Sequence, residues 1–488
     1  MGEMKSKLSI LLALFLLIFT AGCGESPEAV KKARTPLVIN VWSYYTSSTK
    51  DAFDSLVSEF NESVGKEYKI TVKHETIGSL RELNHALMSS ALGEAGSMRM
   101  PNLFISYKGV AKDVEKEIEL IDFNEYFSKE EKEKYVDSFV ELGKVEGGKR
   151  DRLIMLPFGT STTVLMINET DFAPLEAAIG VGYEDLKTYE GLAKAAQKYY
   201  EYTDAKTPTK NDGLALFGLD SVPNYFFEAL KQQGADLLSE KDGKVVANLS
   251  KEHARKIWDN YYVPMVKGHY GKYGKFSSED IKIGKVLLSL CSTTSSTYFP
   301  DQKFVGDEAF DIDLKVLPSP KFEGSEGLFI VQGGGLIGAK KSKEEDEAAV
   351  MFAKWITASK NNSDFTITSS YLPVTKEGFD EAYVSKHTKE KGLSPKIEKT
   401  LICGFNQYKE KTSFYVEPLD GYEGVRSVIE KDFGDFAMND AKEAWAKIQA
   451  GGDYEEVLKS YLSDEHFEEW YSKFIRDVNS ILDDVNKG

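Results

Sequence analysis

Three β-branched apolar runs alternate with two helical patterns between residues 37 and 109, and this order constrains the fold more than any other feature. The runs are LVINVW (37–42), YKITVKHE (68–75) and PNLFISYKG (101–109). In the first helical pattern the apolar residues recur at i, i+3, i+4 and i+7, namely Phe53, Leu56, Val57 and Phe60. The second helical pattern covers 80–92. Strands that alternate with amphipathic helices predict a parallel sheet covered by helices.

Aromatic residues stand where these predicted strands end. They are Trp42, Tyr44, Tyr45 and Tyr107. In parallel α/β sheets, ligands bind beside the loops at the carboxyl ends of the strands. We therefore expect these rings to line a crevice.

Later loops also combine aromatic rings with hydroxyl groups or bare backbone. The segment LIMLPFGTSTTVLMIN (153–168) predicts a strand that stops at its hydroxyl cluster and then resumes. Further loops of this kind lie at Ser292–Tyr298, Gly333–Gly335 and Ser369–Tyr371. Aromatic rings pack on the apolar C–H faces of sugars, and hydroxyls and backbone N–H groups bond their polar rims. The recurrence predicts a site for an uncharged ligand rich in hydroxyls.

The N-terminus has the pattern of an export signal. Lys5 and Lys7 precede the apolar run 8–19, and TAGC follows at 20–23. This predicts a signal peptide over 1–22 and a tether over 23–35. The pattern resembles a bacterial lipoprotein signal, which implies lipid on Cys23, although Thr20 stands where such signals prefer Leu. Ordinary cleavage nearby and an uncleaved anchor are the alternatives.

Several classes of function are disfavoured by what the sequence lacks. The net charge is −17 and no basic stripe carries interleaved aromatics, so we expect no nucleic-acid partner. The histidines form no HExxH motif and no GxSxG motif occurs, so we expect no metal, no cofactor and no catalysis. Cys291 and Cys403 could form a disulfide outside the cytoplasm, but two buried free thiols are the favoured interpretation.

A G-x-G-x-x-G motif occurs at Gly333, Gly335 and Gly338. A dinucleotide site needs a helix to begin inside this turn. Here LIGA reads as strand, and the next helix is predicted to begin only near Ser342. The glycines are better explained by a close approach of the backbone to a ligand or a neighbouring strand.

The order of these segments resembles the extracellular solute-binding proteins of bacterial ABC importers, from the family that takes up maltose-type sugars and glycerol 3-phosphate. The matching segments are INVWSYY with AFDSLVSEFN, PNLFISY, MLPFGTSTTVLMIN, VLLSLCSTTSS, GGGLIGAKKS and SSYLPVTKEGF. The resemblance implies an α/β, two-lobed periplasmic binding protein type II fold, with the ligand cleft between the lobes and a hinge of crossing strands. The lobes would comprise 36–158 with 328–372, and 159–327 with 373–488.

The same resemblance implies which residues contact the ligand. The positions that match are Trp42, Tyr44, Tyr107, Thr160, Ser161, Asn224, Tyr225, Ser295, Ser296, Gly334, Gly335 and Tyr371. The aromatic loops add Tyr45 and Tyr298. The expected partners are a small carbohydrate, the permease of an ABC importer, and the cell membrane through the N-terminal lipid. The protein would be an exported monomer that faces the periplasm or the cell exterior.

One departure from the family bears on the ligand. The phosphate-binding relatives carry an Arg where this chain has SFYVEPLDG (413–421), which offers Tyr415 and Glu417 instead, and Arg426 belongs to the following helix. Without a bidentate guanidinium a phosphate loses its best partner. We therefore favour a neutral carbohydrate over glycerol 3-phosphate or a glycerophosphodiester. The rival functions are a secreted carbohydrate-active enzyme, which needs two facing carboxylates, and an adhesive surface lipoprotein.

Overall fold

The computed structural model describes residues 35–146 and 150–487. The signal-peptide prediction, Cys23 and nearly all of the predicted tether lie outside these residues. One mixed sheet forms the centre of the molecule, and its main strands run in the order β2-β1-β3-β14-β6-β10-β7. These strands are β2 (Ile70–Thr76), β1 (Leu37–Ser43), β3 (Leu103–Ser106), β14 (Leu328–Gly338), β6 (Met155–Asn168), β10 (Leu288–Ser292) and β7 (Phe217–Leu219). In addition, β13 (Leu314–Pro318) pairs with β6, and β15 (Thr412–Phe414) pairs with β14.

The predicted parallel layer is confirmed at the N-terminal end of the chain. Strand β1 pairs in parallel with both β2 and β3. Helices α3 (Ser47–Phe60) and α5 (Leu80–Ala91) connect these strands, and the predicted apolar face of α3 is buried. Shorter two-stranded pairs lie outside the main sheet: β4 (Lys144–Val145) with β5 (Arg152–Leu153), β8 (Leu238–Lys241) with β9 (Lys244–Ala247), and β11 (Gln302–Val305) with β12 (Glu308–Asp311).

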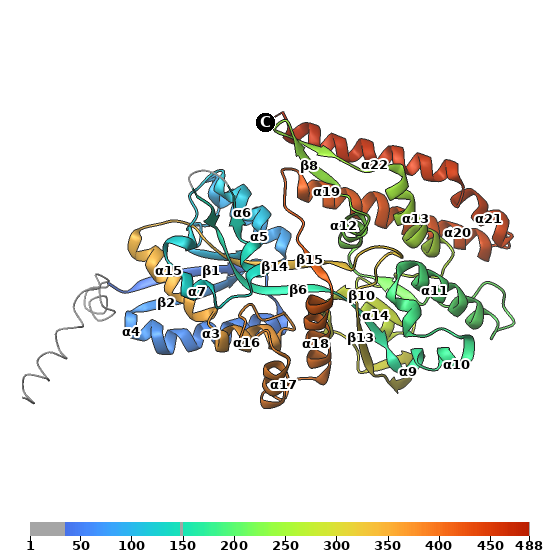
Figure 1. The fold of residues 1–488 in the computed structure, drawn as a ribbon, viewed down its shortest axis with the longest axis horizontal. Helices are drawn as coiled ribbons and strands as arrows, with labels where there is room; N and C mark the ends of the chain where they lie inside the picture. The colour runs from blue at the N-terminus through green and yellow to red at the C-terminus, as the bar shows by residue number, and fades with distance from the viewer. Residues whose placement is uncertain (1–34, 147–149, 488) are drawn as a thin grey trace, which may run out of the picture.

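Two long strands, β6 and β14, run from one half of the molecule into the other (Figure 1). The expected interruption of β6 at its hydroxyl cluster is wrong, because the strand is continuous over 14 residues. Its first part pairs with β14 up to Thr162, and its second part pairs with β10 from Thr163 and with β13 from Val164. Since one partner takes over where the other ends, the backbone groups of this polar stretch keep ladder partners throughout. The glycine motif lies inside β14, as expected, and the next helix follows the cap at Ser342.

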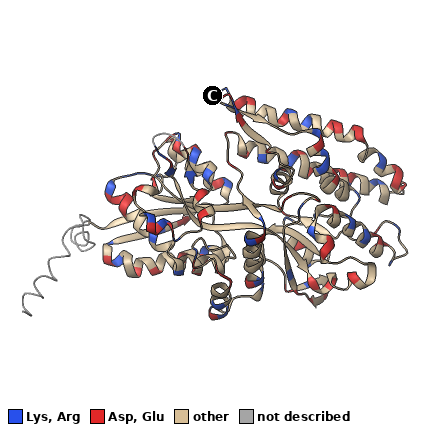
Figure 2. Cartoon of the chain, in the orientation of Figure 1, with Lys and Arg blue, Asp and Glu red and all other residues tan. Residues whose placement is uncertain are grey.

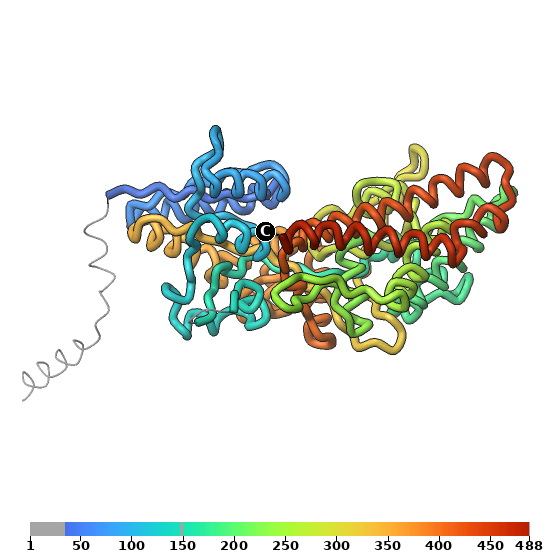
Figure 3. The backbone as a smooth tube through the Cα atoms, turned by 90° about the horizontal axis from the view of Figure 1, so that it is seen from above, coloured from blue at the N-terminus to red at the C-terminus, as the bar shows by residue number. Residues whose placement is uncertain are grey.

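The buried apolar residues form two large clusters, one at each end of the crossing strands. The first cluster contains residues from β1 to Phe158 and from Phe329 to Phe405. The second contains residues from Leu165 to Ile330 and from Val425 to Leu482. We call the elements around these clusters the first and the second lobe. Figures 1 and 3 show both halves with β6 and β14 passing between them.

Helices cover both lobes. In the first lobe they are α6 (Lys108–Glu115), α7 (Lys129–Lys132), α8 (Asp137–Glu141), α15 (Lys343–Ile356), α16 (Ser359–Thr368) and α17 (Glu381–Glu390). In the second lobe they are α9 (Glu169–Phe172), α10 (Leu175–Ile179), α11 (Tyr189–Asp204), α12 (Val222–Gln232), α13 (Lys251–Val266), α14 (Ser277–Lys282), α19 (Tyr422–Ile429), α20 (Phe436–Gln449), α21 (Tyr454–Tyr461) and α22 (Asp464–Val485). No helix in the described ranges is long and apolar enough to cross a bilayer.

Helix α18 (Pro395–Glu410) packs between the lobes. Its Leu401 and Phe405 belong to the first cluster, whereas its Cys403 belongs to a third, small cluster with Val164 of β6. Because one helix contributes to two clusters, the chain has no sharp division at this point. The lobe boundaries drawn from the sequence therefore remain a prediction.

Candidate functional site

One face of the crossing strands carries aromatic rings over bare backbone. Gly159 of β6 and Gly334 of β14 are register partners. A Cβ atom on Gly159 would lie 3.3 Å from Cγ of Tyr371, and one on Gly334 would lie 3.6 Å from the hydroxyl oxygen of Tyr44. Gly159 therefore lets Tyr371 approach the sheet closely, whereas Tyr44 lies at ordinary contact distance above Gly334.

Polar side chains continue this face toward the second lobe. Ser161 and Gln332 are also register partners, two residues from Gly159 and Gly334. Because side chains alternate between the faces of a strand, they share the face on which the tyrosines lie. Aromatic, hydroxyl and amide groups thus stand in one row along the strands that join the lobes.

Three tyrosines from separate segments meet above the glycines. Tyr44 follows β1, Tyr107 follows β3, and Tyr371 follows α16. Burial raises the pKa of Tyr44 well above its ordinary value, and the neighbouring Tyr107 and Tyr371 raise it further. Burial, followed by Tyr107, also raises the pKa of Tyr371. The Tyr44 and Tyr371 hydroxyls remain protonated at neutral pH, so that each can both donate and accept a hydrogen bond.

The second lobe adds a guanidinium and an amide, and Gln332 of β14 contacts that amide. Arg426 of α19 donates from Nη1 to Oδ1 of Asn224 at 3.0 Å and to the hydroxyl of Tyr422 at 3.3 Å. Gln332 donates from Nε2 to the same Asn224 oxygen at 3.2 Å. Although burial lowers the pKa of Arg426, Tyr422 and Glu423 outweigh it, and the net shift is upward. A positive charge therefore lies beside the row of polar groups.

A cavity of about 120 Å³ lies between the lobes beside Gln332, and Tyr44 and Tyr371 are not among the residues that line it. Tyr107 and Gly109 line it from the first lobe, Gln332 lines it from β14, and Tyr422 and Arg426 line it from the second lobe. Ligand sites usually enclose about 300–1,000 Å³. This cavity alone is therefore smaller than a usual ligand site, and it shares Val331 and Tyr415 with an adjoining space of about 680 Å³.

A comparison with known protein families assigns the chain. The model for bacterial extracellular solute-binding proteins matches residues 55–391. The chain belongs to this family. Membership implies an exported protein, and the proteins of this family are binding proteins. A comparison with curated proteins gave no match.

Solved structures of two-lobed binding proteins resemble this solute-binding protein over most of its length. The cyclic alpha-maltosyl-1,6-maltose binding protein of Arthrobacter globiformis has a TM-score of 0.65 and 17% identity, covering 92% of this chain and 99% of that one. A Listeria monocytogenes ABC substrate-binding protein in complex with cycloalternan has a TM-score of 0.64 and 15% identity, covering 93% and 99%. UgpB of Mycobacterium tuberculosis in complex with glycerophosphocholine has a TM-score of 0.62 and 16% identity, covering 88% and 100%. These likenesses confirm the expected two-lobed fold.

Not every residue named from the sequence reaches this site. Trp42 has 2% of its surface exposed and belongs to the first core, so the expectation that its indole lines the crevice is wrong. Tyr45 is also in that core, with its ring centroid 5.3 Å from that of Phe365. Tyr225 is buried in the second core and donates its hydroxyl to the carbonyl of Ile257. These rings follow strands or begin helices, but they point inward.

Not all of the predicted hydroxyl and glycine residues lie on the face of the sheet that carries the tyrosines. Thr160 lies one residue from Ser161, so it points to the opposite face, where it is 1% exposed. A Cβ on Gly335 would lie 2.4 Å from Cγ of Met155, so this glycine serves the packing of two strands. Neither residue presents a side chain to the tyrosines.

The loop after β10 reaches the site from the second lobe. The Ser296 hydroxyl lies 2.6 Å from that of Ser370, directly before Tyr371. Ser295 is half-buried, and Tyr298 is 61% exposed. Tyr415 lines the cavity beside Tyr107, as well as a larger space of about 680 Å³ together with Lys108, Lys144 and Glu417.

Sequence reasoning missed Gln332 and Tyr422 and set Arg426 aside. Gln332 is the one polar side chain between the apolar run LFIV and the three glycines. Arg426 stands next to the buried Val425 in an otherwise amphipathic helix. A lone polar residue in an apolar strand was the available signal for Gln332.

Thiols, potential metal ligands and surface charge are the other chemical features of the described part of the chain. Cys291 and Cys403 are free and buried, as expected, and burial raises the pKa of each thiol to about 12. Residues 35–146 and 150–487 contain no group of three or more acidic, His or Cys side chains arranged to hold a metal. Acidic and basic residues are mixed over both lobes (Figure 2).

Proposed function

We propose that this solute-binding protein captures a carbohydrate, either a sugar or an oligosaccharide, and delivers it to the membrane permease of an ABC importer. The observation that carries the proposal is the packing of Tyr44 and Tyr371 over Gly334 and Gly159. Flat rings beside amide and hydroxyl groups suit the apolar faces and polar rims of sugars. The proteins of Arthrobacter globiformis and Listeria monocytogenes that share the fold are described with cyclic alpha-maltosyl-1,6-maltose and with cycloalternan, which supports a carbohydrate here.

Transport requires the ligand to favour one arrangement of the lobes. A ligand between Tyr371 and Arg426 touches both lobes only when they are close together. It therefore shifts the population toward the closed form, which a permease can recognise. The ligand itself undergoes no bond change in this scheme, so we propose that the protein is not an enzyme. We further propose that lipid on Cys23 keeps the monomer at the cell membrane, facing the periplasm or the exterior.

A glycerophosphodiester or glycerol 3-phosphate is the second candidate ligand, and Arg426 is the observation that favours it. Segment 413–421 carries Glu417 but no guanidinium. In the structure Arg426 lies in the cavity wall, and Glu417 is paired with Lys108 at 2.7 Å. A guanidinium that segment 413–421 lacks is thus present in the cavity wall from α19, and Glu417 has a basic partner. UgpB, which has the same fold, was solved with glycerophosphocholine.

Thermal melting with a panel of compounds tests both candidates. The panel comprises monosaccharides, maltose-type and other oligosaccharides, glycerol 3-phosphate and glycerophosphocholine. A ligand at 100 times its Kd stabilises the protein by about 2.7 kcal/mol. Stabilisation by a neutral sugar supports the carbohydrate proposal, and stabilisation by phosphate compounds alone replaces it with the second candidate. Chromatography of the incubated panel reveals any product, which would mean that the protein is an enzyme.

Native mass spectrometry of protein from its own host provides an independent test. A co-purified oligosaccharide would identify the ligand directly. Replacement of Tyr371 by Leu should abolish the thermal shift, because the variant loses the aromatic face and the hydroxyl. The matched control is Tyr383→Leu, on α17, where the ring stacks with His387 and not over the Gly159 backbone. An unchanged shift with Tyr371→Leu would contradict the proposed site.

A further inference from the structure

A row of lysines on α6 faces a segment that leads into the second lobe. Lys108, Lys112 and Lys116 follow one another at intervals of four residues, so they lie along one side of the helical path. The facing segment is 415–421, between β15 and α19, which we call the strap. Lys108 lies 2.7 Å from Glu417, Lys112 donates to the carbonyl of Pro418 at 3.1 Å, and Lys116 lies 3.0 Å from Asp420.

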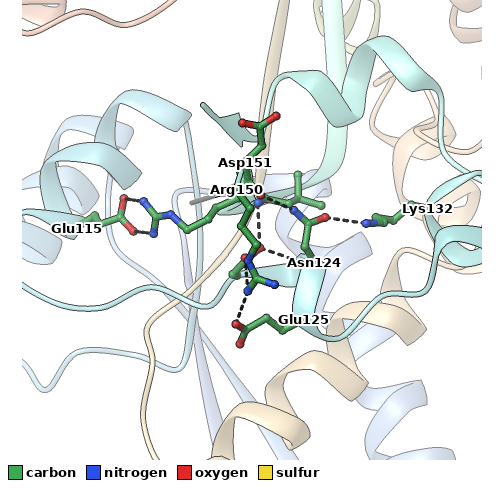
Figure 4. Close-up of polar contacts among 9 residues, drawn as sticks. Glu115, Asn124, Glu125, Lys132, Arg150 and Asp151 are labelled. Carbon is green, nitrogen blue, oxygen red and sulfur yellow. Dashed lines mark hydrogen bonds and ion pairs between the residues drawn. The ribbon is translucent and has the colours of Figure 1, made fainter. Parts of the chain in front are cut away.

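Helix α6 is firmly attached to the first lobe. Its Val110, Ala111 and Val114 are buried in the first cluster. Its last residue, Glu115, accepts two hydrogen bonds from Arg152 of β5, at 2.5 Å and 2.9 Å (Figure 4). The three lysines are therefore held in a fixed position relative to the first lobe.

The strap is attached to the second lobe. Its Val416 and Leu419 pack against the second cluster, although its first residue, Tyr415, packs against the first. At its end Gly421 takes a left-handed backbone conformation with φ +83°, and a Cβ there would lie 3.3 Å from Leu482 of α22. The strap also approaches α6 closely, since a Cβ on Gly109 would lie 3.1 Å from Cβ of Pro418. The lysine contacts thus join two different lobes.

The innermost pair depends on the lobes remaining together. The Lys108 side chain is only 7% exposed, whereas Glu417 is 51% exposed. Within the described residues, Glu417 is the acid placed at ion-pair distance from this ammonium. A buried ammonium without a partner is strongly unfavourable. Removing the charge of Glu417 therefore penalises the arrangement in which Lys108 is buried.

We propose that the contacts of Lys108, Lys112 and Lys116 with the strap form an ionic latch that stabilises the close arrangement of the lobes and so sets the affinity for the transported ligand. The last clause rests on the proposed transport function. Lys116 and Asp420 are more than half exposed, so salt screens this outer pair more than the inner one. The latch therefore loosens from its outer end as ionic strength rises.

Small-angle X-ray scattering of the ligand-free protein tests the latch without knowledge of the ligand. We expect the radius of gyration of the wild type to increase between 50 mM and 1 M NaCl. Glu417→Gln should already have the larger radius at 50 mM, and hydrogen exchange of 108–116 and 415–421 should increase. The control is Glu131→Gln, which removes the charge from a pair of Glu131 with Lys354 at 2.7 Å inside the first lobe. This variant should follow the wild type.

A charge exchange keeps the test conclusive if Glu417→Gln fails to fold. Asp420→Lys places two ammonium groups together at an exposed position and should enlarge the radius at 50 mM NaCl. The double variant Lys116→Asp with Asp420→Lys should restore the wild-type radius. A wild-type radius for both Glu417→Gln and Asp420→Lys at every salt concentration would overturn the latch. That result would leave the proposed ligand class intact, because the panel measurement does not depend on the latch.

Discussion

Arg426 donates a hydrogen bond to Asn224 at 3.0 Å, and the same Asn224 oxygen accepts a second one from Gln332 at 3.2 Å. This oxygen thereby connects α12 and α19 of the second lobe with the crossing strand β14. The arrangement sets the orientation of the Asn224 amide and holds the guanidinium beside the cavity. Any ligand in this cavity meets a charge whose position is determined by both the lobe and the hinge.

We expect Arg426→Gln to weaken ligand binding. Hydrogen bonds that involve a charged group contribute about 1.5–3 kcal/mol, which corresponds to roughly tenfold to a hundredfold in Kd. Isothermal titration with a panel compound that stabilises the wild type measures the change. The loss should be near the lower bound for a neutral sugar and at or above the upper bound for a phosphate compound.

Arg255→Gln is the control for Arg426→Gln. Arg255 lies on α13 and pairs with Asp259 at 2.9 Å and Asp464 at 2.6 Å, away from the cavity. It should bind with the Kd of the wild type. Equal affinities for Arg426→Gln and wild type would remove Arg426 from the site.

Gly159→Ala should weaken binding through Tyr371. The new methyl group would lie 3.3 Å from Cγ of the ring, which is closer than most Cβ contacts, so the ring must move away from the sheet. We expect a severalfold increase in Kd with little change in thermal stability, since misplacing a contact group affects the site more than the core. Titration and melting of the same sample separate the two effects.

Gly182→Ala is the matched control for Gly159→Ala. Its Cβ would lie 3.4 Å from the flexible side chain of Glu176 in the second lobe. It should leave Kd unchanged. If Gly159→Ala also bound with unchanged Kd, Tyr371 would not contact the ligand.

The sequence predicted the architecture better than the orientation of individual rings. Strand and helix periodicity located β1 to β3 and α15, because burial of one face imposes a repeat that the sequence must follow. The same periodicity could not decide whether a ring at the end of a strand points to the crevice or to the core. Trp42 and Tyr44 are two residues apart along the end of β1, yet Trp42 is in the core and Tyr44 is at the glycines.

The sequence did not predict the long-range contacts, because local patterns do not show which distant segments pair. The site depends on which residues of β6 and β14 are opposite each other, and this register is set by pairing between segments far apart in the chain. Arg426 was assigned correctly to a helix, but its position beside Asn224 follows from the packing of α19 on α12, which no local pattern encodes. The bulge between Gly334 and Gly335, which separates a site glycine from a packing glycine, is likewise visible only in the paired strands.

Trp42→Ala tests whether this ring belongs to the core. Replacing a fully buried aromatic residue by Ala costs about 3–5 kcal/mol of unfolding free energy. Chemical denaturation should show this loss. If the ring contacted the ligand instead, Trp42→Phe would weaken binding, whereas we expect Trp42→Phe to bind with the Kd of the wild type.

His269 should make the protein less stable in mild acid. Burial lowers its pKa to about 4 from an ordinary value of 6.5, with a smaller contribution from Lys267, and the side chain lies 5.3 Å from the Tyr200 ring between centroids. Between pH 4 and 6.5 the unfolded chain therefore binds a proton that the folded chain does not bind. Stability rises with pH in this window and falls as the pH is lowered through it. The total change from this one group is roughly 3 kcal/mol.

Denaturant unfolding of the wild type and of His269→Phe at pH 4.5, 5.5, 6.5 and 7.5 measures this contribution. Other groups also titrate in acid, so the relevant quantity is the difference in slope between the two proteins. His269→Phe should lose less stability between pH 6.5 and 4.5 than the wild type. Parallel slopes for wild type and His269→Phe would mean that His269 gains its proton in the folded protein as easily as in the unfolded chain, which its burial against Tyr200 argues against.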